Sequence, residues 1–134
     1  MPAPDSAPGE ARLPRVLVVD DEPLVGRAVR RVLADRTEVA CATGAGEALA
    51  LLEDRAQHFD LVLCDLMMPE MNGAEFRAAM LRVRPELGPR LVFITGGAFT
   101  PEMERFLEQC ACPHVLKPFD VPALRGLVAE RLGG

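Results

Sequence analysis

Short apolar runs that end at a polar residue alternate with segments of helical spacing along the chain. Several runs consist of consecutive β-branched or aliphatic residues, which is typical of strands buried on both faces. The alternation predicts an α/β fold in which a five-stranded parallel sheet is covered by helices on both faces. The predicted strands lie at residues 16–19, 38–41, 59–65, 90–95 and 114–116, and the predicted helices at residues 23–33, 46–55, 74–84, 101–110 and 121–132.

Length and composition narrow the class further. The 134 residues suit one domain. No apolar run approaches the ~18 residues of a membrane span, so we expect no direct contact with a membrane. Acidic residues outnumber basic ones by 20 to 15, and Trp and Tyr are absent. This composition argues against a nucleic-acid partner, because such partners require positive charge and stacking side chains.

The first 14 residues differ in composition from the rest. They hold four prolines among alanine, serine, glycine and charged residues, as flexible or polyproline-like segments do. We therefore divide the chain into a tail or linker at residues 1–14 and one domain at residues 15–134. A linker within a longer protein and a naturally disordered N-terminus both fit the tail.

The cysteine pattern indicates a reducing compartment and hence a cytoplasmic location. Cys64 lies inside an apolar run and is interpreted as a core residue. Cys110 and Cys112 form a C-x-C pair, without the second pair that would complete a zinc site. A disulfide framework is not expected at this size and composition either.

Five polar residues stand directly after predicted strands, where a parallel sheet brings them to one edge. Three carboxylates gathered there repel one another unless a cation is present. Mg²⁺ suits such a site, because it takes carboxylate, water and phosphate oxygens. Taken singly, each residue also fits a helix cap, a turn or a surface charge, but their convergence favours a shared site. The five are Asp20, Asp21, Asp65, Thr95 and Lys117.

The chemistry of this set suits a phosphoryl group. Lys117 supplies a fixed positive charge and Thr95 a hydrogen-bond donor for equatorial phosphoryl oxygens. Asp20 and Asp21 are adjacent in the chain and are predicted to hold the metal ion. Asp65 is then the predicted nucleophile.

Four sequence blocks resemble the signature of bacterial response-regulator receiver domains. They are VLVVDDEP at residues 16–23, DLVLCDLMMPEMNG at 60–73, FITGG at 93–97 and VLKPF at 115–119. The resemblance implies a flavodoxin-like, doubly wound (βα)5 fold with the strand order 2-1-3-4-5. It also implies a phosphoacceptor domain of a two-component system, rather than an enzyme, that switches its protein contacts when phosphorylated.

The resemblance also gives each site residue a role. It implies that Asp65 takes the phosphoryl group from a phosphohistidine, carried by a sensor histidine kinase or a histidine phosphotransfer domain. The implied protein ligands of Mg²⁺ are Asp21 directly, Asp20 through water, Asp65, and the backbone carbonyl of Met67. The residues implied to contact the phosphoryl oxygens are Thr95 and Lys117.

One position departs from the family pattern. Many receivers carry Tyr or Phe three residues before the site lysine, and His114 stands there in this chain. A histidine can rotate between two states and titrates near neutral pH. The usual coupling between the site threonine and an aromatic ring is therefore in question here.

The partner surfaces are inferred from the predicted site. A histidine donor must approach Asp65 in line, so we expect it to dock beside the site mouth. The last two helices and the last strand are the expected face for output contacts or a homodimer. The candidate docking residues are Leu24, Val25, Ala28, Pro118 and Phe119.

Two contexts fit the chain, which ends two residues after its last predicted helix, so we expect no DNA-binding domain to follow. One is a free-standing receiver. The other, which the Pro/Ala-rich start and residues 95–101 favour, is the receiver of a hybrid sensor histidine kinase.

Two other functions compete with the receiver interpretation. Haloacid-dehalogenase-like phosphatases also use Asp, Thr, Lys and Mg²⁺, but their two acids after the first strand are separated by one residue. Asp20 and Asp21 are adjacent instead. A docking module without phosphoryl transfer would have no need for the complete polar set.

Overall fold

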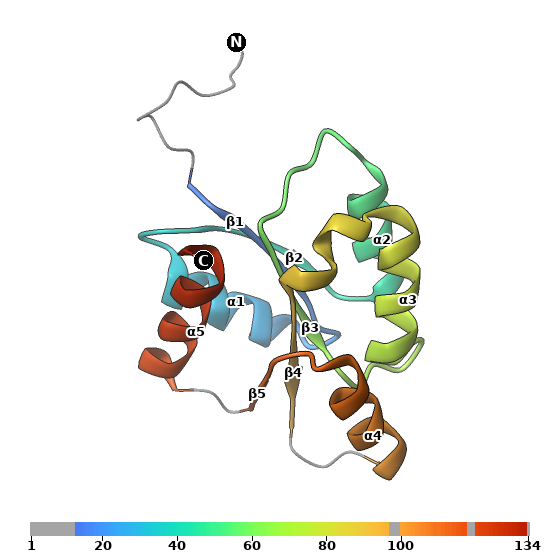
Figure 1. Cartoon of the computed structure of the whole chain (residues 1–134). Coiled ribbons are helices and arrows are strands. Elements are labelled where there is room, and N and C mark those ends of the chain that lie inside the picture. The colour runs from blue at the N-terminus through green and yellow to red at the C-terminus, as the bar shows by residue number, and fades with distance from the viewer. Residues whose placement is uncertain (1–12, 97–99, 118–119, 134) are drawn as a thin grey trace.

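The computed structural model describes residues 13–96, 100–117 and 120–133, and its centre is a five-stranded parallel sheet (Figure 1). The strand order is β2-β1-β3-β4-β5, which confirms the expected flavodoxin-like order. The strands are β1 (Arg15–Val19), β2 (Glu38–Ala42), β3 (Leu61–Asp65), β4 (Leu91–Thr95) and β5 (His114–Leu116). The α-helices are α1 (Pro23–Leu33), α2 (Ala45–Glu53), α3 (Gly73–Val83), α4 (Pro101–Cys110) and α5 (Val121–Gly133). Residues 1–12, most of the predicted tail, lie outside the described residues.

The sheet separates two apolar clusters. Alternate residues of a strand point to opposite faces, so Leu17 and Val19 of β1 join one cluster, while Val16 and Val18 join the other. Helices α2, α3 and α4 cover the first face, and α1 and α5 cover the second (Figure 1). Covering both faces is what the uninterrupted apolar strands predicted.

The start of α3 is fixed by two local features. Asn72 accepts a hydrogen bond from the Glu75 amide, and the Glu75 side chain accepts one from the Asn72 amide, which completes a capping box. A Cβ atom on Gly73 would lie 2.6 Å from the Phe93 ring and 2.8 Å from Leu66. Only glycine lets the helix begin this close to β3 and β4.

One element was not predicted. Pro85 was expected to end a helix, and α3 does end at Val83, but a 3₁₀ helix, η1 (Pro85–Arg90), begins at once. Proline suits the first position of a helical turn, where its missing N–H is not needed. The proline that stops one helix therefore starts the next turn.

The two cysteines of the C-x-C pair form a disulfide, contrary to expectation. Ala111 between them has a left-handed backbone, with φ 54°. This conformation ends α4 and brings the two Cα atoms to 5.2 Å, a normal separation for a disulfide. Composition alone gave no sign of that backbone conformation.

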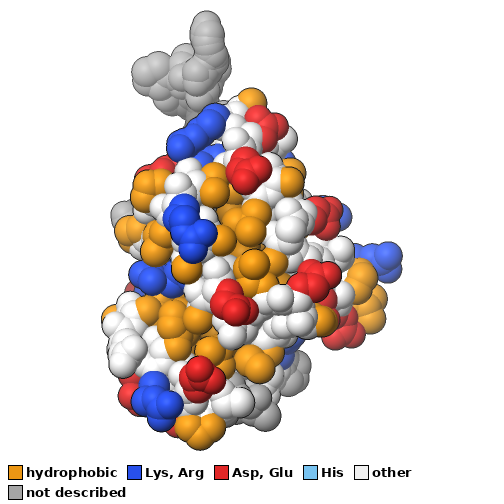
Figure 2. Space-filling model, turned by 90° about the vertical axis from the view of Figure 1, so that its right-hand side faces the viewer, with side chains coloured by type: hydrophobic (Ala, Val, Ile, Leu, Met, Phe, Trp, Pro, Cys, Tyr) orange, Lys and Arg blue, Asp and Glu red, His pale blue; other side chains and the backbone are white. Residues whose placement is uncertain are grey.

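The face that carries α2, α3 and α4 mixes apolar side chains with isolated acidic and basic ones (Figure 2). Among the described helices, none combines the length and the apolarity that crossing a membrane requires.

Candidate functional site

The carboxyl ends of the central strands carry the predicted polar residues. Asp20 comes directly after β1, Asp65 is the last residue of β3, and Thr95 is the last residue of β4. The backbone amide of Lys117, just after β5, donates a 2.7 Å hydrogen bond to the carbonyl of Thr95. The parallel register therefore brings the four strand ends to one edge, as the sequence predicted.

Three carboxylates form a tight cluster at this edge. One carboxylate oxygen from each of Asp20, Asp21 and Asp65 lies within 4.8 Å of the other two. Asp20 and Asp65 are buried, and Asp21 is exposed. The cluster thus has two fixed acids beneath one that faces solvent.

Lys117 is the counter-charge of the two buried acids. Its Nζ lies 3.0 Å from Oδ2 of Asp20 and 3.7 Å from Oδ2 of Asp65. Burial alone would lower the pKa of Lys117, but the hydrogen bond to Asp20 and the charge of Asp65 outweigh it and raise that pKa. Lys117 therefore stays protonated at neutral pH.

One ammonium group does not balance the cluster. The pKa of Asp65 is raised from 3.8 to about 6, first by burial and then by the negative charge of Asp20. The Met67 amide and Lys117 pull the pKa the other way but do not cancel the rise. Asp65 is thus a buried carboxylate whose ionised form becomes more stable when a cation binds beside it.

Backbone amides orient the two buried carboxylates. The Glu22 amide donates to Oδ1 of Asp20 at 2.9 Å, and the Met67 amide donates to Oδ1 of Asp65 at 3.3 Å. The thiol of Cys64, next to Asp65, donates to the Asp65 carbonyl at 3.3 Å. These backbone donors were not predicted, because any residue type supplies an N–H and no sequence pattern marks it.

The donor set fits a hard divalent cation. It consists of oxygen ligands only, and its negative charge exceeds the one nearby ammonium group. Such a set favours Mg²⁺ or a similar ion over zinc, which prefers nitrogen and sulfur ligands. The Met67 carbonyl stays a predicted ligand, since the contact that the structure gives Met67 is through its amide.

The predicted docking residues lie partly on the surface. Leu24 is 62% exposed and Ala28 is exposed, both on α1 just after the acidic residues. Val25 is half-buried and packs against the core, so much of its role is structural. The other two candidates, Pro118 and Phe119, lie outside the described residues.

Comparisons with known proteins all point to one family. The model of the response regulator receiver domain matches residues 16–129. The transcriptional regulatory protein AruR of Pseudomonas aeruginosa is 37% identical over 116 residues, which cover 82% of this chain and 46% of that protein. The DNA-binding response regulator MtrA of Mycolicibacterium smegmatis is 35% identical over 118 residues, 88% of this chain and 50% of that protein. The chain spans half or less of these relatives.

Solved structures agree with this result. A CheY-like response regulator receiver domain protein from Methanospirillum hungatei matches with a TM-score of 0.79 and 30% identity, over 91% of this chain and 95% of that one. The chemotaxis protein CheY4 of Vibrio cholerae matches with a TM-score of 0.75 and 27% identity, over 90% of this chain and 100% of that one. The phosphatase considered from the sequence has no support from these matches.

Proposed function

The chain belongs to the response regulator receiver domain family, a family of phosphoacceptors, and we propose that Asp65 is its phosphoacceptor. The observation that carries the proposal is the meeting of three carboxylates and Lys117 Nζ at one edge of the sheet. Burial and the charge of Asp20 both disfavour the ionised form of Asp65. Forming an acyl phosphate replaces that carboxylate with a phosphoryl group of greater negative charge, which Mg²⁺ and Lys117 would balance.

The proposed reaction transfers one phosphoryl group. An oxygen of Asp65 attacks phosphorus in line, the P–N bond to the donor histidine breaks, and the imidazole keeps the electron pair and takes a proton. Mg²⁺, held by Asp20, Asp21, Asp65 and the Met67 carbonyl, would supply positive charge to the phosphoryl oxygens. Lys117 and Thr95 would hold those oxygens through an ammonium group and a hydroxyl.

The first experiment is intact-mass measurement after incubation with Mg²⁺ and acetyl phosphate or phosphoramidate. We expect a gain of one phosphoryl group that requires Mg²⁺ and is lost in Asp65→Asn. Asp35→Asn is the matched control, because Asp35 is an exposed aspartate that follows α1 and is not a member of the carboxylate cluster. It should be phosphorylated like the wild type.

A phosphohistidine donor is tested next if the small donors give no product. Phosphorylation of Asp65→Asn to the wild-type level would place the acceptor elsewhere. No product from any donor would contradict phosphoryl transfer and favour the docking-module function.

A receiver domain implies a histidine kinase partner, and we place the donor's docking surface on α1. Leu24 supports this, since a 62% exposed leucine directly after the acidic residues is available to a partner. Leu24→Ala should slow transfer from a phosphohistidine protein and leave phosphorylation by acetyl phosphate unchanged. Equal slowing with both donors would mean that Leu24 supports the site rather than the partner.

The kind of protein that carries this domain is a separate proposal. We propose a cytoplasmic domain of a hybrid sensor histidine kinase, with no nucleic-acid contact of its own, on the basis of the Pro/Ala-rich start and residues 95–101. The size of the native protein on an immunoblot separates a hybrid kinase from a free-standing receiver.

We also propose a homodimer through α4, β5 and α5, supported by the exposure of Leu116 of β5 and Val121 of α5. Sedimentation of the phosphorylated and unphosphorylated chain tests it. A monomer in both states would contradict the dimer.

A further inference from the structure

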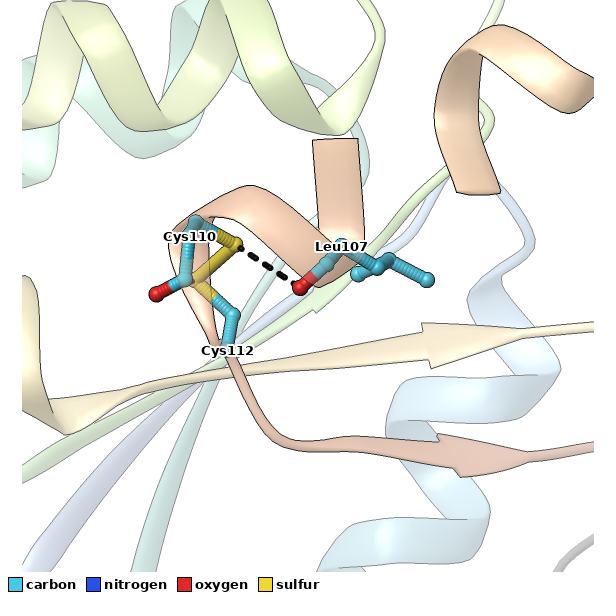
Figure 3. The surroundings of a disulfide bond; sticks show 3 residues. All are labelled: Leu107, Cys110 and Cys112. Atoms are coloured by element: carbon cyan, nitrogen blue, oxygen red, sulfur yellow. Dashed lines mark hydrogen bonds between the residues drawn. A yellow bond between two sulfur atoms is a disulfide. The ribbon is translucent and has the colours of Figure 1, made fainter. Parts of the chain in front are cut away.

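The disulfide between Cys110 and Cys112 lies at the turn from α4 to β5 (Figure 3). It is remote in the chain from the carboxylates, and the phosphoryl-transfer proposal makes no use of it. The other cysteines, Cys41 and Cys64, are free thiols. The bond therefore needs an explanation of its own.

Stabilisation of the fold is a weak explanation. The stabilisation that a disulfide gives by restricting the unfolded chain grows with the length of the loop it closes. Only Ala111 separates these two cysteines. The turn is already held by a hydrogen bond from the Ala111 amide to the Leu107 carbonyl, at 3.1 Å. A bond that adds so little to the fold is better placed to form and break than to hold the chain together.

The two sulfurs are within reach of small molecules. Cys110 and Cys112 are both half-buried, and both line a cavity of about 490 Å³ between α3, η1, β4 and α5. This volume lies in the range of small-molecule sites. Arg77 of α3 and Arg131 of α5 line the same cavity.

The arginines make the cavity positive. None of the residues that line it in the described part of the chain is acidic. The Nε atoms of Arg77 and Arg131 are buried and have no hydrogen-bond partner among the described residues. A buried donor without a partner is costly, and a carboxylate is the acceptor that a guanidinium group binds best. Two arginines and two cysteines therefore line the same cavity.

We propose that Cys110 and Cys112 form a reversible thiol–disulfide site whose reagent is an anionic small-molecule disulfide of the oxidised glutathione class. One cysteine thiolate attacks a reagent sulfur, forms a mixed disulfide and releases one reagent thiolate. The second cysteine thiolate attacks the mixed disulfide at the protein sulfur, closes the Cys110–Cys112 bond and releases the second reagent thiolate. The protein loses two electrons and two protons, and one reagent disulfide becomes two thiols.

The arginines have two roles in this site. Their charge stabilises the thiolate that attacks, and their guanidinium groups bind the reagent's carboxylates beside it. Excess reduced thiol runs the same steps backwards. The redox state of the pair then tracks the ratio of disulfide to thiol around the protein.

The turn that holds the disulfide is hydrogen-bonded to the sheet. The carbonyl of Pro113, directly after Cys112, accepts a 2.9 Å hydrogen bond from the amide of Phe93 in β4. The disulfide therefore lies between the end of α4 and the start of β5. This redox site is independent of the phosphoacceptor proposal, and either one stands if the other fails.

The experiment equilibrates the full-length chain in glutathione buffers of graded ratio, traps free thiols with an alkylating reagent and counts the labels by intact mass. We expect four labels at the reducing end and two at the oxidising end, with Cys41 and Cys64 still labelled after denaturation. Cys110→Ser should stop at a glutathione adduct on Cys112, whereas the control Cys41→Ser should still close the Cys110–Cys112 bond. Four labels across the whole range would overturn the proposal.

The arginine contribution has its own readout. Arg77→Gln with Arg131→Gln should slow oxidation by oxidised glutathione about tenfold, since a charged cleft concentrates its ligand by at least that factor. Oxidation by the neutral disulfide of mercaptoethanol should slow by less. Arg27→Gln, an exposed arginine on α1, is the control and should react like the wild type. Equal slowing with both reagents would overturn the proposal that the site prefers an anionic disulfide.

Discussion

Among the described residues, the charged side chains that are buried as a whole lie in two places, and these two places are built differently. Arg84, at the end of α3, is buried with three acceptors for its guanidinium group: the carbonyls of Leu52 and Gln57 at 3.0 and 3.1 Å, and Oε2 of Glu86 at 2.9 Å. Asp65, at the end of β3, is buried beside another aspartate, and its nearest ammonium nitrogen is 3.7 Å away. The positive charge of Arg84 is balanced by the acceptors around it, whereas the negative charge of Asp65 adds to a site that is already negative.

The different surroundings of Arg84 and Asp65 indicate different roles for the two buried charges. A buried charged group with a hydrogen-bond acceptor at each of its nitrogens holds elements together, and Arg84 links α3 to the end of α2 and to the segment that leads into β3. A buried charge held near others of its own sign costs stability, and such groups gather at functional sites. This contrast fits a structural role for the Arg84 cluster and the proposed chemical role of the Asp65 cluster.

Arg84→Met should give the largest change in stability. The substitution leaves the Leu52 and Gln57 carbonyls without their donor and removes a buried charge-assisted network, which costs about 3 kcal/mol. Urea unfolding followed by circular dichroism measures the loss. Arg82→Met, at an exposed position on the same helix, is the control and should change stability little. Equal losses from both substitutions would remove the distinction between the two arginines.

Asp65→Asn should raise the free energy of unfolding, whereas Arg84→Met lowers it. Because the folded-state pKa is raised to about 6, the folded protein holds a proton that the unfolded chain has released between pH 4 and 6. The free energy of unfolding therefore falls as the pH rises through this window, and the penalty is complete above it. In EDTA, Asp65→Asn should be more stable than the wild type at pH 8, by about 2 kcal/mol after a discount for solvent screening, and the gain should shrink towards pH 4.5.

Asp35→Asn in the same buffers is the control for Asp65→Asn, and its stability should match the wild type across the pH range. A wild type as stable as Asp65→Asn at pH 8 would show that the carboxylates at the sheet edge are balanced after all.

Mg²⁺ should stabilise the wild type, by somewhat less than the gain expected from Asp65→Asn. At ten times its dissociation constant, an ion that binds only the folded state adds about 1.4 kcal/mol. Unfolding with and without Mg²⁺ at pH 8 measures this gain, which should disappear in Asp65→Asn. Arg84→Met should keep the full gain, because the buried arginine takes no part in the ion site. Loss of the gain in Arg84→Met would mean that the two buried charges are coupled.

Glu86→Gln should have the smallest effect. The Glu86 side chain is 54% exposed, so water replaces much of what its carboxylate gives to Arg84. We expect the urea midpoint to stay close to that of the wild type. A loss of stability as large as that of Arg84→Met would show that this ion pair, rather than the hydrogen bonds to the carbonyls, stabilises the fold.

Most of the fold could be predicted because its pattern is local. The strands are apolar and the helices have helical spacing, so α1, α4 and β5 begin and end where they were predicted, and no other boundary shifts by more than two residues. The 3₁₀ turn that begins at Pro85 escaped prediction, because a proline after a helix marks the end of that helix but does not specify the next element. The strand order came from the resemblance to the family rather than from the apolar pattern.

The candidate site was predictable to the level of residue type and strand end. The gathering of Asp20, Asp65 and Lys117 is a consequence of parallel strands alone. The burial of Arg84 was not predictable, because its acceptors are backbone carbonyls 27 and 32 residues away and leave no mark on the sequence. The Cys110–Cys112 bond was missed for a similar reason, since it depends on the backbone of Ala111.

The contact between Lys117 and Asp20 joins residues 97 positions apart. A chain growing on the ribosome acquires all the acidic residues of the site long before the lysine that balances them. Until β5 adds to the edge of the sheet, the carboxylates have no ammonium group to share. The site is therefore completed only when β5 joins the sheet, and a copy that stops before Lys117 has the acidic residues of the site without their counter-charge.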